Sequence, residues 1–474
     1  MKMAVTLPEY LPDQTSISGG LNVAQNVFPR IDGYGPVQGF SGFSDALAGP
    51  FNGGGAFIDG GGATTLLAGT TSAVYRYSSV GWVALATGLA AASEWRFSQF
   101  GEYVVAVTGA GTKVISLSVG TCTDLTGAPS GTSVAVVGDY VVIGQNSGDK
   151  LGIYTSAYND HTDWDYASPT STATYQPMLD GGEVMGITGG EYGVILQRQA
   201  IRRMSQTGDS TAPFQYDVVS NSVGCASKAS VVAVGRTVYW LSDRGFMALS
   251  DGQGTPIPIG AQKVDRTFQA SVNREDYERI FSCADPQNKT IIWCVPGTPG
   301  TLWIYNYELQ RWSTASLVID GLFPAFTAST TLEDLNLTYP SLDAMPFSLD
   351  DGKFTGGSPR LYVVSSGVMG TLSGPNLKAT FEGGFIQPAR NNVARLISIR
   401  PVTDAVEGNA VSFDCRARLG DAENIISASG LRASGIMPLR ASGRYVKPKW
   451  TIAAGSVWSF AQGFDLEYEV GGER

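Results

Sequence analysis

The chain has 474 residues, of which 16% are charged and 43% are hydrophobic, and its formal net charge is −10. This length provides for two or three structural units with full hydrophobic cores, so a small scaffold stapled by disulfides or metals is excluded. The 59 glycines and 23 prolines supply many turns, but the apolar content is too high for a disordered chain. The composition therefore predicts an all-β protein made of short strands and tight turns.

The N-terminal sequence and the cysteines bear on where the protein folds. MKMAVTLPEYLPD lacks the apolar core of a secretory signal, and no segment has the ~18 continuous apolar residues of a membrane helix. The five cysteines are widely spaced without a C-x-x-C pair, which favours neither a disulfide framework nor a zinc site. We expect a protein that folds in a reducing cytoplasm and does not insert into a membrane.

Residues 1–62 are rich in Gly and Pro, with runs such as GYGPVQGFSGFS, FNGGG and DGGG. Such runs favour turns over a packed core. The glycine runs also lack the Lys-Ser/Thr that completes a phosphate-binding loop. We therefore predict a Gly-rich N-terminal arm with hairpins over this range.

A short phrase recurs from residue 100 onward, in which a turn precedes an apolar strand. Its copies are FGEYVVAV (Phe100–Val107), VGDYVVIG (Val137–Gly144), GGEYGVIL (Gly189–Leu196), VGRTVYWL (Val234–Leu241) and the degenerate NKTIIWCV (Asn288–Val295). The glycines at 101, 138, 190 and 235 are 37, 52 and 45 residues apart, close to the ~40–50 residues of a four-stranded propeller blade. We predict propeller-like blades over residues 63–319. The simpler alternative is that a Gly-rich all-β chain produces such phrases by chance.

Two further patterns fall within these blades. The spacing Tyr-x-Tyr-x4-Trp occurs in Tyr75–Trp82 and again in Tyr305–Trp312. It is typical of an outer hairpin whose aromatic side chains pair across antiparallel strands. Val264, Phe268 and Val272 lie four residues apart, so one short amphipathic helix is predicted near residues 261–272.

The rest of the chain divides into two regions. Residues 320–377 begin with a poorly patterned insertion over 320–358, longer than ordinary loops, and continue with the final blade strands. Residues 378–474 return to strand-like runs such as ARLISIRPV and WSFAQGFDLEYEV, which predict a separate β-sandwich-like module. The expected fold is an irregular β-propeller with this C-terminal module and the N-terminal arm.

Charge is distributed unevenly along the chain. Residues 1–379 carry 21 basic and 32 acidic side chains, whereas residues 385–450 carry 10 basic and 5 acidic ones. An acidic chain is a poor tight binder of DNA, although an acidic wall lets DNA slide past without sticking. The basic stretch therefore stands out as a candidate contact region.

This basic stretch contains the pentapeptide Leu-Arg-Ala-Ser-Gly twice, eight residues apart. Small residues and Gly at this spacing favour a mobile hairpin or loop that presents Arg432, Arg440 and Arg444. We interpret these arginines as candidate assembly residues that meet an acidic face of a neighbouring subunit or of a partner ring.

Few residues offer catalytic chemistry. His161 is the one histidine, so any Ser-His-Asp or Cys-His catalytic site would have to use it, and a multi-histidine metal site is excluded. Its phrase YNDHTDWD (Tyr158–Asp165) offers oxygen ligands for calcium, but the spacing is not that of an EF-hand and an ordinary turn is the simpler interpretation. Asp350–Asp351 could act as an acid/base pair, yet DDGK is typical of a turn. We expect no enzyme, no cofactor and no metal.

Both ends of the chain resemble one family, the nozzle or hub proteins of short-tailed bacteriophages, also called packaged-DNA stabilisation proteins. The N-terminal resemblance lies in Asn26–Arg30 (NVFPR), Gly33–Pro36 (GYGP) and Gly39–Ser41 (GFS). The C-terminal resemblance lies in Arg444–Val446 (RYV), Trp458, Gly463–Phe464 and the closing GGER. These are Gly, Pro and aromatic patterns without catalytic residues, so no family active site is implied.

The resemblance implies an irregular β-propeller with added β-domains in a virion tail, assembled in the cytoplasm of the host bacterium. Six copies would form a ring below the portal and its adaptor (the head-tail connector) and contact other tail proteins such as a fibre, needle or spike. The lumen would retain packaged DNA and conduct it non-specifically during ejection.

On this view Tyr34, Pro36 and Phe40 are candidate assembly residues. The alternative for these three side chains is a packed hairpin with no contact to a partner. The alternative for the whole chain is a monomeric β-propeller that binds or cleaves a carbohydrate through loops at one mouth.

Overall fold

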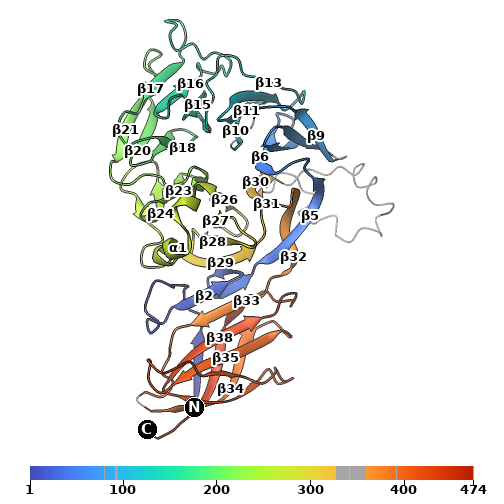
Figure 1. Ribbon diagram of the computed structural model, residues 1–474, viewed down its shortest axis with the longest axis vertical. Helices are drawn as coiled ribbons and strands as arrows, with labels where there is room; N and C mark the ends of the chain where they lie inside the picture. The colour runs from blue at the N-terminus through green and yellow to red at the C-terminus, as the bar shows by residue number, and fades with distance from the viewer. Residues whose placement is uncertain are drawn as a thin grey trace.

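A ring of four-stranded sheets forms one end of the molecule and a β-sandwich forms the other, with both chain ends in the sandwich (Figure 1). This computed structural model describes residues 1–472 except 79–80, 91–93, 147, 327–340, 342–358 and 391. Within that part, α1 (Asp265–Ser271) is the one α-helix, and no helix is long and apolar enough to cross a membrane. The predicted all-β class with a propeller is confirmed.

The described residues form seven blades. The first five blades use four consecutive strands each. The first blade contains β6 (Phe51–Ile58), β7 (Thr64–Thr70), β8 (Val74–Ser78) and β9 (Gly81–Ala86), and the second contains β10 (Arg96–Phe100), β11 (Tyr103–Thr108), β12 (Gly111–Ser116) and β13 (Cys122–Asp124). The third contains β14 (Ser133–Val137), β15 (Tyr140–Gly144), β16 (Gly152–Thr155) and β17 (Thr174–Pro177), the fourth contains β18 (Val184–Thr188), β19 (Gly193–Gln197), β20 (Ile201–Gln206) and β21 (Phe214–Ser220), and the fifth contains β22 (Val232–Val234), β23 (Thr237–Ser242), β24 (Gly245–Ser250) and β25 (Ile257–Pro258). The sixth blade is β26 (Phe281–Asp285), β27 (Thr290–Val295), β28 (Gly300–Asn306) and β29 (Arg311–Leu317). The seventh is β30 (Gly321–Phe326), β31 (Pro359–Ser365), β32 (Val368–Asn376) and β5 (Gln38–Ala46).

The recurring phrase is the hairpin between the first and second strands of consecutive blades. Its turns join β10 to β11, β14 to β15, β18 to β19, β22 to β23 and β26 to β27. Gly101, Gly138 and Gly235 have φ values of 57° in these turns, in the left-handed region that glycine adopts without steric cost. Lys289 takes the same conformation, at φ 55°, in the degenerate copy. The prediction of blade-like repeats is confirmed.

The Tyr-x-Tyr-x4-Trp pattern marks the hairpin between the third and fourth strands of two blades. Tyr77 lies opposite Trp82 in β8–β9, and Tyr305 lies opposite Trp312 in β28–β29. The ring centroids are 5.1 Å and 4.9 Å apart. Aromatic pairs therefore stabilise these outer hairpins, as predicted.

A strand from the N-terminal region closes the propeller. β5 pairs antiparallel with β32, so the seventh blade combines residues 38–46 with residues 321–326 and 359–376. The Ser44 Oγ accepts a hydrogen bond of 2.8 Å from the backbone N–H of Met369, 325 positions later. The expected final blade strands lie in this blade, whereas nearly all of the insertion expected at 320–358 lies outside the described residues.

The sandwich has two layers. One layer contains β3 (Val27–Arg30), β4 (Gly33–Pro36), β39 (Ala461–Val470), β34 (Ala394–Thr403) and β37 (Met437–Gly443), and β1 (Lys2–Thr6) also pairs with β39. The other contains β2 (Leu21–Gln25), β33 (Ala379–Gly383), β38 (Tyr445–Ile452), β35 (Asn409–Arg416) and β36 (Ile425–Ser427). Since β2 also pairs with β29, this second layer continues into the sixth blade as one nine-stranded sheet.

The N-terminal arm predicted over residues 1–62 is therefore wrong in this structure. β1 to β4 belong to the sandwich, β5 closes the seventh blade and β6 opens the next one. The Gly-Pro runs misled the prediction because the glycines serve close strand contacts: a Cβ on Gly33 would lie 2.2 Å from the carbonyl oxygen of Ala461. The C-terminal module predicted from residue 378 is complete only with strands from residues 1–36.

This division changes the charge assigned to each domain. Residues 1–36 and 378–472 together carry 13 basic and 12 acidic side chains, whereas residues 37–377 carry 18 basic and 29 acidic ones. The sandwich is thus close to neutral overall, and its basic stretch at 385–450 is balanced by acidic residues on β39 and in the connections between the N-terminal strands. The propeller holds the acidic excess of the chain.

Asn26 joins the two domains. Its backbone N–H donates to the Thr314 carbonyl of β29 at 2.6 Å, its Nδ2 donates to the Lys378 carbonyl at 2.8 Å, and its Oδ1 accepts from the Ser316 N–H at 2.8 Å. Its φ is 62°, in the left-handed region that Asn tolerates better than most residues. One side chain therefore satisfies backbone groups of the propeller and of the sandwich.

The N-terminus of α1 carries a buried carboxyl group. Asp265 is 8% exposed, and its Oδ1 accepts a hydrogen bond of 3.0 Å from the Phe246 N–H. Burial, with a smaller contribution from the negative charge of Asp13, raises the pKa of Asp265 to about 6. Phe268 on the helix and the capping residues Val264 and Val272 are buried as predicted.

We predict that Asn26→Ala lowers the free energy of unfolding by about 3 kcal/mol, because it removes two hydrogen bonds worth ~1 kcal/mol each and strains a left-handed residue by ~1 kcal/mol. Asn26→Gly is the matched control, since it removes the same bonds without the strain and should cost about 2 kcal/mol. Urea unfolding of both variants measures the difference. Equal stability of wild type and Asn26→Ala would contradict the role of Asn26.

A second prediction concerns pH. The raised pKa of Asp265 means that the folded state holds its proton more tightly than the unfolded state between about pH 4 and pH 6. The carboxyl therefore destabilises the fold most at pH 7, and this cost disappears as the pH falls below about 6. We expect the stability gained by Asp265→Asn over wild type to be larger at pH 7 than at pH 5, in urea unfolding at both pH values. Asp217→Asn, on the exposed face of β21, is the control, and a gain independent of pH would contradict the assignment.

Candidate functional site

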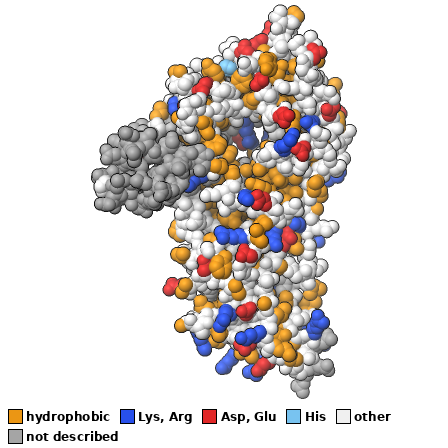
Figure 2. Space-filling view, turned by 180° about the vertical axis from the view of Figure 1, so that it is seen from behind, with side chains coloured by type: hydrophobic (Ala, Val, Ile, Leu, Met, Phe, Trp, Pro, Cys, Tyr) orange, Lys and Arg blue, Asp and Glu red, His pale blue; other side chains and the backbone are white. Residues whose placement is uncertain are grey.

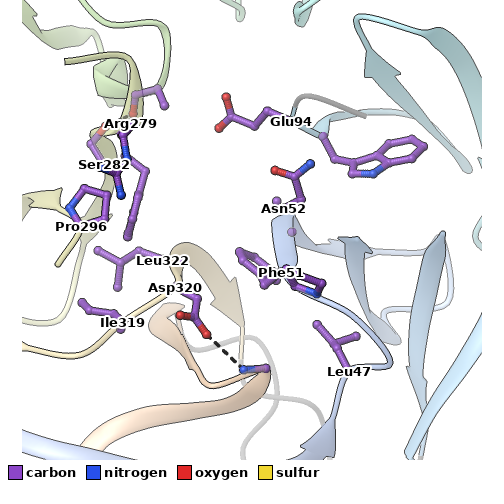
Figure 3. A pocket seen from close by; sticks show the side chains of 18 of the residues that line it. Leu47, Phe51, Asn52, Glu94, Arg279, Ser282, Pro296, Ile319, Asp320 and Leu322 are labelled. Atoms are coloured by element: carbon purple, nitrogen blue, oxygen red, sulfur yellow. Dashed lines mark hydrogen bonds between the residues drawn. The ribbon is translucent and has the colours of Figure 1, made fainter. Parts of the chain in front are cut away.

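A cavity with a volume of about 1040 Å³, here called the central cavity, lies on the inner side of the ring of blades. Its walls come from the first strands of several blades, β6, β10, β26 and β30, and from the segments that lead into them (Figure 3). Aromatic and polar side chains share this wall, including Phe51, Asn52, Glu94, Arg279 and Asp320. The ring of blades thus encloses an open polar space.

Several charged groups of the central cavity have partners within the wall. The Arg96 guanidinium pairs with the Glu94 carboxylate at 2.9 Å. Asp320 Oδ2 accepts a hydrogen bond of 3.1 Å from the Gly367 N–H, drawn as a dashed line in Figure 3. The Arg279 Nη1 donates to Asp276 at 3.4 Å. These contacts hold the wall in place and leave hydrogen-bonding groups facing the cavity.

The sequence prediction missed this wall. Asn52, Glu94, Arg279 and Asp320 lie within two residues of the start of a first strand, so the repeat itself marks their position. The polar residues at the start of each blade would have indicated this wall. It was overlooked because the search centred on motifs with catalytic spacing.

The three N-terminal candidate residues, Tyr34, Pro36 and Phe40, are buried or half-buried. Tyr34 is 1% exposed, packs on Phe381 with ring centroids 5.5 Å apart, and donates its hydroxyl to the Pro8 carbonyl at 2.9 Å. Phe40 lies opposite Leu372 in the closing blade and is half-buried. Pro36 is half-buried at the end of β4. Tyr34 and Phe40 thus stabilise the domains, as in the packed alternative, and Tyr34 is inaccessible to a partner.

The three arginines differ in exposure. Arg432 and Arg440 are exposed, the first in the turn closed by the Gly435 N–H to the Arg432 carbonyl and the second on β37. Arg444 is half-buried and its Nε is shielded from solvent without a hydrogen-bond partner among the described residues. The two identical pentapeptides therefore adopt different structures, a turn and a strand, and only the first fits the predicted loop.

Figure 2 shows Lys and Arg gathered at the sandwich end of the molecule, with Asp and Glu between them. The register of the sheet explains this mixture. Arg395 and Arg400 on β34 lie opposite Glu469 and Asp465 on β39. The face is therefore striped with both signs of charge, a pattern that sets register between surfaces more than it attracts one sign.

The loop around His161 folds as a compact turn. The His161 ring lies 4.4 Å from the Tyr103 ring, and its carbonyl accepts from the Trp164 indole N–H at 2.8 Å. Burial lowers the pKa of His161. The Asp160 and Asp163 carboxylates accept backbone N–H groups within the same loop, as expected of the turn interpretation. Asp350–Asp351 lie outside the described residues.

The cysteines are unpaired. Cys225, Cys283, Cys294 and Cys415 are buried and Cys122 is half-buried. Among the residues that the structure describes, no group of three or more His, Cys, Asp or Glu side chains comes together.

No family model and no curated protein matches this chain. Similar solved structures include the extracellular domain of a putative one-component system from B. thetaiotaomicron, with 9% identity and a TM-score of 0.42 over 82% of this chain and 46% of that one. Another belongs to the Mitotic Checkpoint Complex, with 11% identity and a TM-score of 0.43 over 72% of this chain and 93% of that one. A third is PorZ of the type-IX secretion system of Porphyromonas gingivalis, with 9% identity and a TM-score of 0.37 over 86% of this chain and 52% of that one. The chain thus spans about half the length of the first and the third. Likeness at this level carries no argument about function.

We predict that Arg432→Glu and Arg440→Glu each change the free energy of unfolding by less than about 0.5 kcal/mol, because both side chains are exposed. Arg444→Glu should cost about 1–3 kcal/mol, since it alters a shielded polar group. Thermal or urea unfolding of the three variants tests the difference. A large loss of stability in Arg440→Glu would contradict its assignment as a free surface residue.

Proposed function

We propose that this protein is a virion structural protein, a ring-forming nozzle or hub in the tail of a short-tailed bacteriophage. It would extend the channel of the portal and adaptor, help to retain packaged DNA and conduct the DNA during ejection. The observation that carries the proposal is the placement of the segments that resemble this family. Asn26–Pro36 and Arg444–Phe464 lie together in the sandwich, and Gly39–Ser41 continue from it into the closing blade.

The subunit is suited to a mechanical role. The nine-stranded sheet crosses from propeller to sandwich without a flexible linker, and one hydrophobic core contains Trp312 and Phe246 of the propeller as well as Phe381 and Trp450 of the sandwich. A body held in this way transmits load between neighbouring layers of an assembly. The proposal therefore assigns the function to the shape and surfaces of the subunit.

The charge distribution supports a role beside DNA. The propeller part of the sequence has a net charge of −11, and duplex DNA carries one negative charge per ~1.7 Å. A lumen lined with acidic blades would repel DNA and let it slide, whereas a basic lumen would bind phosphates and act as a brake. We infer that the propeller contributes the lumen wall.

The central cavity favours a second candidate, a monomeric propeller that binds a carbohydrate. A polar space of about 1040 Å³ with Phe51, Glu94 and Asp320 on its wall offers an aromatic face and hydrogen-bond acceptors to a sugar. This candidate requires a monomer with glycan affinity. The nozzle requires closed cyclic assembly.

Native mass spectrometry of the purified protein separates the two candidates. We expect a closed ring, six copies in the family pattern, that binds duplex DNA no more tightly than the non-specific range of ~10⁻⁴–10⁻⁶ M at physiological salt. The double variant Arg432→Glu/Arg440→Glu should assemble more slowly, with the larger effect at low salt, because exposed charges steer association. Arg244→Glu/Arg274→Glu, at two exposed positions of the propeller, is the matched control. A monomer that binds a glycan through Glu94 would overturn the nozzle in favour of the second candidate.

A further inference from the structure

The first strand of the sandwich has one paired edge and one open edge. β1 pairs with β39 in register, from Lys2 opposite Glu467 to Thr6 opposite Gly463. The bonds at the two ends of this ladder come from odd-numbered residues: Tyr468 N–H donates to the Met1 carbonyl at 2.9 Å, and Leu7 N–H donates to the Gln462 carbonyl at 2.7 Å. Since antiparallel pairs alternate, the backbone groups of Lys2, Ala4 and Thr6 point away from β39.

These outward groups are unused. In the described part of the chain no hydrogen bond reaches the backbone N–H or C=O of Lys2, Ala4 or Thr6, and the three residues are exposed. β1 is short and carries one charge, at Lys2, but no proline or bulge blocks its free edge. An edge of this kind is a template for another strand.

An apolar groove of about 250 Å³ runs beside the open edge, between β1 and the opposite layer of the sandwich. Met3 and Val5 line one side, and Phe381, Ile386 and Trp450 are on its other walls. Gly19 also lines it, and a Cβ there would meet no atom within 4 Å. There is therefore free space at this part of the groove wall.

We propose that an extended segment of a partner polypeptide binds here by adding a strand to the free edge of β1. The unpaired N–H and C=O groups, repeated at every second residue, match the backbone of a peptide and no other common ligand. The apolar groove requires apolar side chains at alternate positions of that segment, and Lys2 favours an acidic residue on its outer face. This inference does not rest on the tail function.

A second copy of this chain is the less suitable occupant. A strand of a second copy that is paired on both edges would have to leave its sheet to reach β1, and an edge strand would have to bring its whole folded domain against the sandwich. Two β1 strands paired antiparallel would form a two-fold contact that closes at two copies. A free segment of another protein meets neither obstacle.

The test uses the full chain and a fluorescein-labelled octapeptide that alternates valine or leucine with threonine and carries one glutamate. We expect the peptide to bind and the amides of Lys2, Ala4 and Thr6 to exchange more slowly with solvent in its presence. Ala4→Pro should weaken binding about tenfold, because it removes an outward N–H and leaves the acceptor on the peptide unpaired. It leaves the β39 ladder intact, since the Ala4 N–H is not part of it.

Ala4→Ser keeps the N–H and is the matched control, and Val5→Lys should also weaken binding by placing a charge in the groove. Circular dichroism and thermal unfolding check that each variant is folded. Equal binding by wild type and Ala4→Pro, or no protection of the three amides, would overturn the proposal. So would self-association of the wild type that Ala4→Pro abolishes, because the occupant would then be a second copy.

Discussion

The hydrogen bonds of Asn26 with β29 and with the start of β33 determine how the two domains are arranged. This residue ends β2, the strand at which a propeller blade and a sandwich layer become one sheet. Its left-handed backbone turns the chain from β2 into β3, and its side chain bonds one backbone group beside β33 and one on β29. Because the sheet is continuous, the orientation of the sandwich relative to the propeller follows from strand pairing.

Local chemistry explains which elements could be predicted. The hairpin phrases have positive-φ glycines at fixed places, and the aromatic hairpins pair Tyr77 with Trp82 and Tyr305 with Trp312, so both patterns are visible in the sequence. The helix near residue 265 was equally local, because Phe268 and its neighbours face one core. Each of these features depends on residues fewer than ten positions apart.

The elements that could not be predicted depend on partners far away in the chain. Gly33 is typical of a loop until Ala461 is placed against it, and Tyr34 resembles an exposed aromatic until Phe381 covers it. The central cavity is similar, since Glu94 and Asp320 meet only when the ring closes. The two Leu-Arg-Ala-Ser-Gly copies make the same point, because β34 pairs with the second copy and not with the first.

The placement of the N-terminal strands has a consequence during synthesis. Residues 1–46 are synthesised more than 300 residues before their partners in β32, β33 and β39. Such long-range pairing folds slowly, and neither domain is complete until nearly the whole chain is available. A chain that ends early lacks β39, leaves β1 without its ladder and exposes the sandwich core. A break in the chain before β39 therefore affects the fold at both ends of the sandwich, because β1 and β34 both pair with that strand.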